Sequence, residues 1–327
     1  MIRYIIGRLI GSALVLLAVT ALVFVLVRLT PGDPVGSFLG FAAFHDPRQA
    51  AALRHTLGFD RPVAIQYLFF LGRMFHGDLG QDPFTGEPVT KLLAERAPAT
   101  LELAILTLIF STVIAVFLGA TAATHRGRSR DTLIRVGTIV GLSIPNFWLG
   151  LLLLLIFGLY VNGILPPGGF VPLTENPLDN LYHMILPVIV LGLPNLALIS
   201  RILRSSMLDA LARDYIVFAR VMGLPERTVV SRIALPNAII PTTTVVGLLL
   251  GYLIGGAVVV EVVFTIPGVG QLMVDSFQKN DYPVALGTTL FIATAFVTMN
   301  FVVDVLYAYL NPKIRDLYLG QLRSRDA

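Results

Sequence analysis

The sequence predicts an all-α integral membrane protein with six transmembrane helices. Of its 327 residues, 55% are hydrophobic and only 13% are charged, and the formal net charge is +4. A soluble domain carries about 25% charged residues because its surface faces water, so this composition excludes a soluble protein. The charges also leave six long uncharged stretches between them. These are residues 9–27, 103–124, 136–161, 180–200, 233–260 and 282–303.

Each uncharged stretch has a length that suits a spanning helix. A helix needs about 20 apolar residues to cross a hydrocarbon core of about 30 Å, and it satisfies its own backbone hydrogen bonds there. The first stretch follows Arg3 and Arg8, as in a secretory signal. However, it exceeds the roughly 7–15 apolar residues of a signal, and no small-residue cleavage site follows it. We therefore expect it to be retained as the first span.

The basic residues predict the orientation of the six spans. They gather at residues 1–8, 126–135, 201–232 and 313–325, whereas the connections 162–182 and 262–281 are poor in them. Because cytoplasmic loops are enriched in Lys and Arg, both termini are predicted to be cytoplasmic. The connection 30–98 also contains basic residues, but a segment of this length translocates largely regardless of its charge.

The external segment 30–98 is predicted to contain two short helices. The first helix is predicted to start at Asp46 and Pro47 and to end at Gly58. The second is expected from Pro62 to His76, with several apolar side chains on one face. Two interpretations stay open: a small cap that lies on the outer membrane face, or a docking surface for an external partner.

The connection between the fourth and fifth spans has the most informative pattern. Two short amphipathic helices fit residues 211–236, and Gly223-Leu224-Pro225 separates them. Glycine permits the positive φ of a helix C-terminus, and proline is favoured where the next helix starts. The arginines of this connection are explained by topology alone. A helix–turn–helix at the inner membrane face, however, is also a rigid lever.

This connection resembles the EAA loop of binding-protein-dependent ABC importer permeases. The family pattern is Glu-Ala-Ala, three residues, Gly, nine residues, Ile, one residue and Leu-Pro. In this sequence the matching positions are Ala219, Gly223, Ile233, Leu235 and Pro236. Val217 and Phe218 stand where the family has Glu and the first Ala, and this departure leaves the helix–Gly–helix framework intact.

Eight further blocks in order resemble the B-type permease subunit of dipeptide/oligopeptide importers and of their nickel-related relatives. They are residues 28–35, 57–62, 77–80, 98–103, 143–150, 261–270, 281–284 and 304–312. The resemblance implies an ABC type I importer permease fold in the cytoplasmic (inner) membrane. Residues 1–98 would be an added N-terminal helix and external segment. Residues 99–327 would be a five-helix core with the coupling loop at about 201–236.

The resemblance also implies partners. These are a second, C-type permease, two cytoplasmic ATPase subunits and an extracytoplasmic substrate-binding protein, besides membrane lipid; no nucleic-acid partner is expected. In the family the EAA helices sit in a groove of the ATPase and carry its ATP-driven closure to the permease. The implied contact residues are Ala219, Arg220, Gly223, Leu224, Pro225, Ile233, Leu235 and Pro236. Peptides are the expected substrate, although nickel, glutathione and opine importers use similar permeases.

No enzyme chemistry is predicted. A phosphate-binding P-loop requires Lys directly after Gly, but Lys91, Lys279 and Lys313 follow Thr, Gln and Pro. The sequence contains no cysteine, and its five histidines show no metal-binding spacing. We therefore expect no catalytic, metal or cofactor site in this chain, and ATP hydrolysis in separate subunits.

A glycine ridge in the fifth span has two possible roles. Gly247, Gly251 and Gly255 are spaced four residues apart, which lets another helix approach closely. The ridge either packs within the subunit or forms a sliding surface against a second permease. Two other functions are alternatives for the whole chain: a self-sufficient secondary carrier or channel, and a membrane scaffold or receptor subunit without a transport role. A carrier is disfavoured because no internal repeat or central membrane charge is visible.

Overall fold

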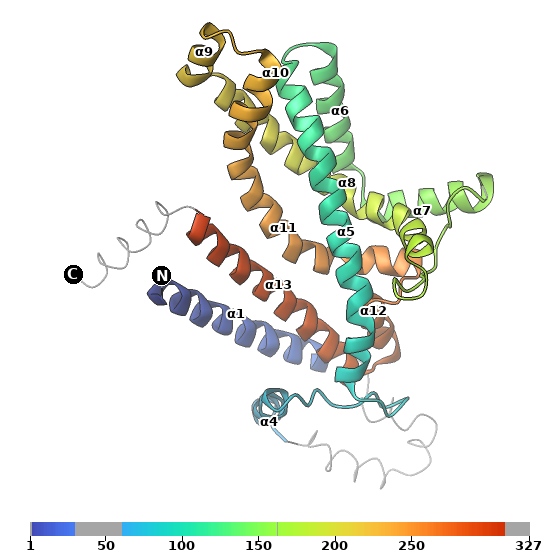
Figure 1. Ribbon diagram of the computed structural model, residues 1–327. Helices are drawn as coiled ribbons and strands as arrows, with labels where there is room; N and C mark the ends of the chain where they lie inside the picture. The colour runs from blue at the N-terminus through green and yellow to red at the C-terminus, as the bar shows by residue number, and fades with distance from the viewer. Residues whose placement is uncertain (1, 30–60, 162, 311–327) are drawn as a thin grey trace. The chain divides into compact units, whose positions relative to one another are not determined.

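The protein is built from helices, as the sequence predicts (Figure 1). The computed structural model describes residues 2–29, 61–161 and 163–310, so the helix expected at residues 46–58 lies outside the described residues. Five described helices are long and apolar enough to cross a membrane, and a bent pair is the sixth candidate. The prediction of a multi-pass all-α membrane protein is confirmed.

The chain divides into two compact units. Unit 1 consists of Met1–Thr100 and Pro267–Phe301, and unit 2 consists of Leu101–Ile266 and Val302–Ala327. Two long helices contribute residues to both units: α5 (Val89–Thr124) and α13 (Tyr282–Leu310).

Unit 1 is organised around the first span. Helix α1 (Ile2–Leu29) runs next to α13, and α4 (Val63–Phe75) packs against both (Figure 1). Helix α4 confirms the helix predicted at residues 62–76. One buried cluster joins the three helices through Phe24, Phe70, Tyr282, Leu286 and Leu290.

Unit 1 also contains a helix that the sequence did not reveal. The sequence predicts a connection at residues 262–281, but α12 (Val269–Lys279) lies within them. The backbone N–H of Val269 donates to Thr100 Oγ1 at 2.8 Å, and this bond satisfies one free donor of the helix start. The helix ends at Asn280, which adopts left-handed backbone angles with φ 57°. Asp281 caps the start of α13: its Oδ1 accepts a hydrogen bond from the N–H of Val284 at 3.1 Å.

Unit 2 has α8 (Pro177–Leu211) packed along α11 (Leu235–Phe264). Helix α6 (Ser129–Ser143) also packs on α8. The remaining elements are α7 (Asn146–Leu155), a π-helical turn Ile156–Tyr160, α9 (Asp214–Val221), α10 (Glu226–Thr228) and a π-helical segment Val229–Ala234.

The third uncharged stretch is not one continuous helix. Helices α6 and α7 meet at a bend of 97°, so residues 136–161 cover parts of both. Ile144 has extended angles, φ −83° and ψ 121°, and it directly precedes Pro145. A proline disfavours helical angles in the residue before it, which explains the break.

Candidate functional site

The candidate site is the segment that joins α8 to α11, which we call the α9–α10 segment (residues 214–228). Helix α8 ends at Leu211, and Arg213 leaves helical geometry with φ −81° and ψ 150°. Its carbonyl accepts from Ile216 N–H at 3.0 Å, which starts α9. Asp214 lies in the first turn, where a carboxylate interacts favourably with the helix dipole.

A glycine turn ends α9. Gly223 has φ +79°, Leu224 N–H donates to Ala219 O at 3.2 Å, and Gly223 N–H donates to Arg220 O at 3.0 Å. This pair of bonds defines a Schellman motif, which requires left-handed angles at its glycine. A Cβ added at Gly223 would have nothing within 4 Å. The glycine is therefore needed for its backbone angles and not for space.

An ion pair crosses this turn. The Arg220 guanidinium donates to both carboxylate oxygens of Glu226, with Nη2···Oε1 2.7 Å and Nε···Oε2 3.0 Å. The hydrogen bond to Glu226 raises the pKa of Arg220, which keeps the guanidinium charged. Both side chains are exposed, so the ion pair contributes little to the free energy of unfolding. It links the last turn of α9 to the first residue of α10.

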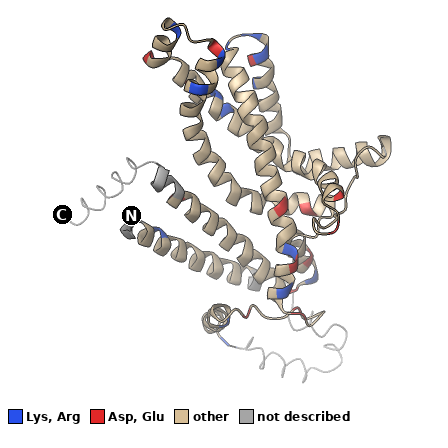
Figure 2. Cartoon of the chain, viewed as in Figure 1, with Lys and Arg blue, Asp and Glu red and all other residues tan. Residues whose placement is uncertain are grey.

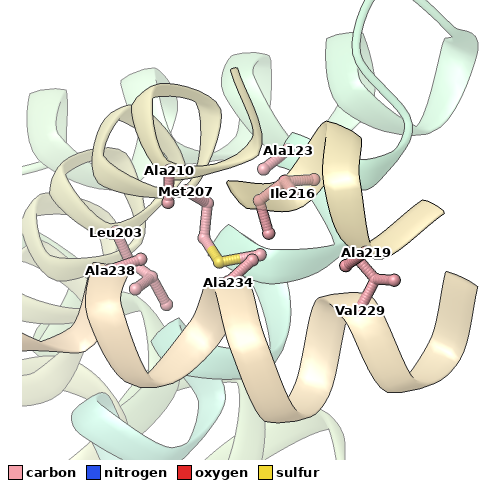
Figure 3. Packing of buried hydrophobic residues seen from close by; sticks show 9 residues of the cluster. All are labelled: Ala123, Leu203, Met207, Ala210, Ile216, Ala219, Val229, Ala234 and Ala238. Atoms are coloured by element: carbon pink, nitrogen blue, oxygen red, sulfur yellow. The ribbon is translucent and has the colours of Figure 1, made fainter. Parts of the chain in front are cut away.

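A buried apolar cluster supports the α9–α10 segment from beneath (Figure 3). Helix α8 contributes Leu203, Met207 and Ala210, α9 contributes Ile216 and Ala219, and α5 contributes Ala123. Val229, Ala234 and Ala238 come from the π-helical segment and α11. Alanines let the backbones approach closely around the larger Met207 and Ile216. The short helix α9 is thereby fixed to the two long helices.

The outer side of α9 is apolar and exposed. Ile216 and Ala219 face inward, whereas the remaining large apolar side chains point away from the core. The exposed set is Tyr215, Val217, Phe218, Val221, Met222 and Leu224. Contiguous exposed apolar side chains of this kind mark an interaction surface. Sequence reasoning treated Val217 and Phe218 only as departures from a motif; the three-residue spacing of Ile216 and Ala219 was the signal that could have found this face.

A second ion pair fixes the helix that leads into the segment. Arg204 of α8 donates to Asp131 of α6 through Nε at 2.7 Å and Nη2 at 2.8 Å. Asp131 is buried, and it also accepts from Gly127 N–H at 3.0 Å. Sequence reasoning missed this pair because it counted the basic residues only as topology determinants. Its two partners lie 73 residues apart and no local pattern connects them.

The predicted contact residues separate into two groups. Arg220, Gly223, Leu224 and Pro225 are exposed on the turn, as is Pro236 at the start of α11. Ala219 is buried, and Ile233 and Leu235 are half-buried against the same cluster. The first group can meet a partner directly, whereas the second group positions it.

The glycine ridge packs at least partly within the chain. A Cβ added at Gly247 would lie 2.9 Å from Val303 Cγ1 of α13, so a larger residue there would collide. Gly251 is buried and Gly255 is exposed. Close approach within the subunit is thus realised at Gly247, and only Gly255 is open to another molecule.

Arginines gather at the end of unit 2 that carries the α9–α10 segment and the connection between α5 and α6 (Figure 2). The segment therefore presents an apolar face within a basic surrounding. This distribution agrees with the positive side of a membrane protein.

Comparisons with known proteins match nearly the whole chain. Residues 115–316 match the family model of the binding-protein-dependent transport system inner membrane component, and residues 1–104 match the model of its N-terminal part.

The matches to three relatives cover almost the full length of each relative. The di/tripeptide transport system permease protein of Pseudomonas aeruginosa is 40% identical, over 91% of this chain and 94% of the relative. The glutathione transport system permease protein of Salmonella typhimurium is 39% identical, over 96% and 99%. A peptide transport system permease protein of Brucella abortus is 37% identical, over 92% and 95%.

Proposed function

Because the chain belongs to the family of binding-protein-dependent transport system inner membrane components, we propose that it forms part of a path for short peptides, driven by ATP hydrolysis in partner subunits. The chain is a multi-pass inner-membrane permease subunit of an ABC importer. Peptide cargo is supported by relatives named for di/tripeptides, glutathione and peptides, since glutathione is itself a tripeptide.

The α9–α10 segment is the proposed contact with the ATPase. One observation carries this proposal: an exposed apolar face on α9 stands on a buried cluster that reaches α5, α8 and α11. An ATPase that covers Phe218, Val221 and Met222 would bury apolar area at the centre of the contact. Its movement would pass through the buried cluster to the spanning helices, because a packed core is a stiff body.

Two matched phenylalanines test the contact. Phe218 on α9 is 65% exposed, and Phe84 in the loop before α5 is 52% exposed. Phe218→Ser is expected to reduce co-purification of the ATPases with the assembled transporter about tenfold or more, since a buried aromatic anchor contributes about 2 kcal/mol or more. Phe84→Ser is expected to leave co-purification unchanged. Equal amounts of ATPase with both variants would contradict the contact.

The remaining partners are proposed to be a second, C-type permease, a pair of cytoplasmic ATPases and an extracytoplasmic substrate-binding protein. One side of α11 supports a contact with another permease, because Leu248, Tyr252, Gly255 and Val259 are exposed at helical spacing there. Proteoliposomes test this composition. Uptake is expected only when all partners and ATP are present, and uptake by this chain alone would support a self-sufficient carrier instead.

A further inference from the structure

Helix α4 has apolar side chains on two opposite faces. Tyr67, Phe70 and Met74 pack against α1 and α13. On the other side, Ile65 is 41% exposed and Phe69 is 56% exposed. The inner face explains how α4 is held in unit 1, but it leaves the outer side chains without a role.

The two edges between these faces differ in character. At about 100° per residue, Ala64, Leu68, Leu71 and Phe75 follow one another along one edge, and all four are apolar. Gln66 and Arg73 share the opposite edge. Beside them, the Arg61 guanidinium lies 4.8 Å from the ring centre of Phe69. The helix is therefore graded from apolar to polar across its width, as an interfacial helix is.

The contacts of α4 place it at the depth of the membrane surface. Tyr67 Oη lies 2.7 Å from Thr20 Oγ1 and donates to Leu17 O at 3.0 Å. The apolar span of α1 ends at Leu26, six residues after Thr20 (26 − 20 = 6). At 1.5 Å per residue, Tyr67 reaches about 9 Å inside that end. Interfacial helices bury their apolar side by a similar depth, about 5–10 Å.

The direction of α4 agrees with this depth. Figure 1 views α4 almost along its axis, whereas α1 runs across the view, so the two helices cross steeply. Because α1 spans the membrane, a helix that crosses it steeply at this depth lies along the membrane surface. The outer face of α4 then continues the lipid-exposed face of α1, where Leu22 and Leu26 are exposed.

We propose that α4 is a membrane-surface anchor that binds phospholipid. Its edge with Leu68 and Phe75 lies among the acyl chains. Its edge with Gln66 and Arg73 lies among the head groups, where Arg61 and Arg73 meet phosphate and favour anionic lipid. The partner of the outer face of α4 is thus lipid and not a soluble protein.

Single cysteines test the proposal, because the natural chain has none. Nitroxide labels are attached at Leu68→Cys, Phe75→Cys and Arg73→Cys in the full chain, purified with cysteine-free partner subunits. The nanodiscs contain phosphatidylethanolamine and phosphatidylglycerol in equal amounts. Leu22→Cys on α1 serves as the lipid reference and Phe84→Cys as the water reference, and collision with oxygen and with a water-soluble nickel complex is measured for each label.

We expect labels at Leu68 and Phe75 to match Leu22, several-fold more open to oxygen than to nickel, and the label at Arg73 to lie between Leu22 and Phe84 in its openness to nickel. Labels at Leu68 and Phe75 that are as open to nickel as Phe84 would place this edge in water and overturn the proposal in favour of a soluble partner. Labels shielded from both reagents would show a protein cover and also overturn it. Replacing phosphatidylglycerol by phosphatidylcholine is expected to make the label at Leu68 more open to nickel, because that variant keeps Arg61 and Arg73 and loses their anionic head groups; no change would overturn the head-group contact.

Discussion

The turns at Gly223 and at Asn280 share one hydrogen-bond pattern but have opposite surroundings. Leu224 N–H donates to Ala219 O at 3.2 Å, and Asp281 N–H donates to Ser276 O at 2.8 Å. Around Gly223 the neighbouring side chains are exposed, and an added Cβ would meet nothing within 4 Å. Around Asn280, by contrast, Ser276, Asp281 and Tyr282 are buried.

The difference shows how one backbone motif can serve two purposes. At Gly223 the turn presents an apolar helix face outward, so its residues are free to contact another protein. At Asn280 the turn fixes α12 to α13 inside unit 1. Asparagine tolerates left-handed angles better than most residues, which allows a side chain where the chain is packed.

Reporter fusions give the largest expected effect, an all-or-none signal. A reporter that is active only outside the cytoplasm is expected to be active after residue 80 and inactive after residue 128 or residue 226, because the arginine-rich connections stay inside. This result would place the Gly223 turn on the ATPase side. Activity after residue 226 would contradict both the orientation and the proposed ATPase contact.

Two methionines distinguish the buried cluster under α9 from the exposed apolar face of α9. Met207 is 0% exposed in the cluster under α9, and Met222 is 67% exposed beside Gly223. Met207→Ala is expected to lower the free energy of unfolding by about 2–5 kcal/mol, because it leaves a cavity. Met222→Ala is expected to change it by less than about 0.5 kcal/mol while it weakens ATPase binding. Thermal unfolding and co-purification measure the two effects. Equal loss of stability in both variants would show that Met222 is also part of the core.

Strain at the Gly223 turn is the next largest effect. A β-branched residue in left-handed angles costs about 1–2 kcal/mol, so Gly223→Val is expected to uncouple uptake from ATP hydrolysis while the chain still inserts. Gly127 offers a matched control, since its φ is +75° and an added Cβ would also meet nothing within 4 Å. Gly127→Val carries the same strain and should leave uptake coupled. Normal uptake by Gly223→Val at wild-type abundance would remove the coupling role.

The last expected effect is a gradual pH dependence at the Asn280 turn. Burial, with a further contribution from the Asp82 carboxylate, raises the pKa of Asp281 from 3.8 to about 7, against the Val284 N–H and Lys279, which lower it. The folded chain therefore holds a proton that the unfolded chain releases. This contribution to stability is complete below about pH 4 and is lost as the pH rises through about 7.

Asp281→Asn keeps a side-chain acceptor for Val284 and removes the titrating group. Thermal unfolding of the purified variant across this pH range is expected to show a flatter profile than that of the wild type. Asp82→Asn is expected to move the loss of stability to lower pH, because it removes a neighbouring charge. A wild-type profile in the Asp281→Asn variant would assign the pH dependence to another group.

Features set by local patterns were predictable from the sequence. The uncharged stretches gave the spans, Pro62 and His76 bracketed α4, and Gly223 marked the turn after α9. Features set by distant partners were not predictable. The Asp131–Arg204 pair, for example, joins two helices through residues that lie 73 positions apart. Helix α12 was not predictable because its charged residues, Asp275 and Lys279, are typical of a connection.

The alanines beneath α9 determine which mutations this part of the protein tolerates. Five of the nine residues in Figure 3 are alanines: Ala123, Ala210, Ala219, Ala234 and Ala238. An extra methylene in a filled core costs about 1–3 kcal/mol, so a randomised library should accept few residues larger than alanine there. The exposed positions 217, 218, 221 and 222 have no such limit, and under the proposed ATPase contact their variation is set by the ATPase. If the proposed contact holds, specificity for one ATPase over another evolves on the outer side of α9 while the support beneath it stays the same.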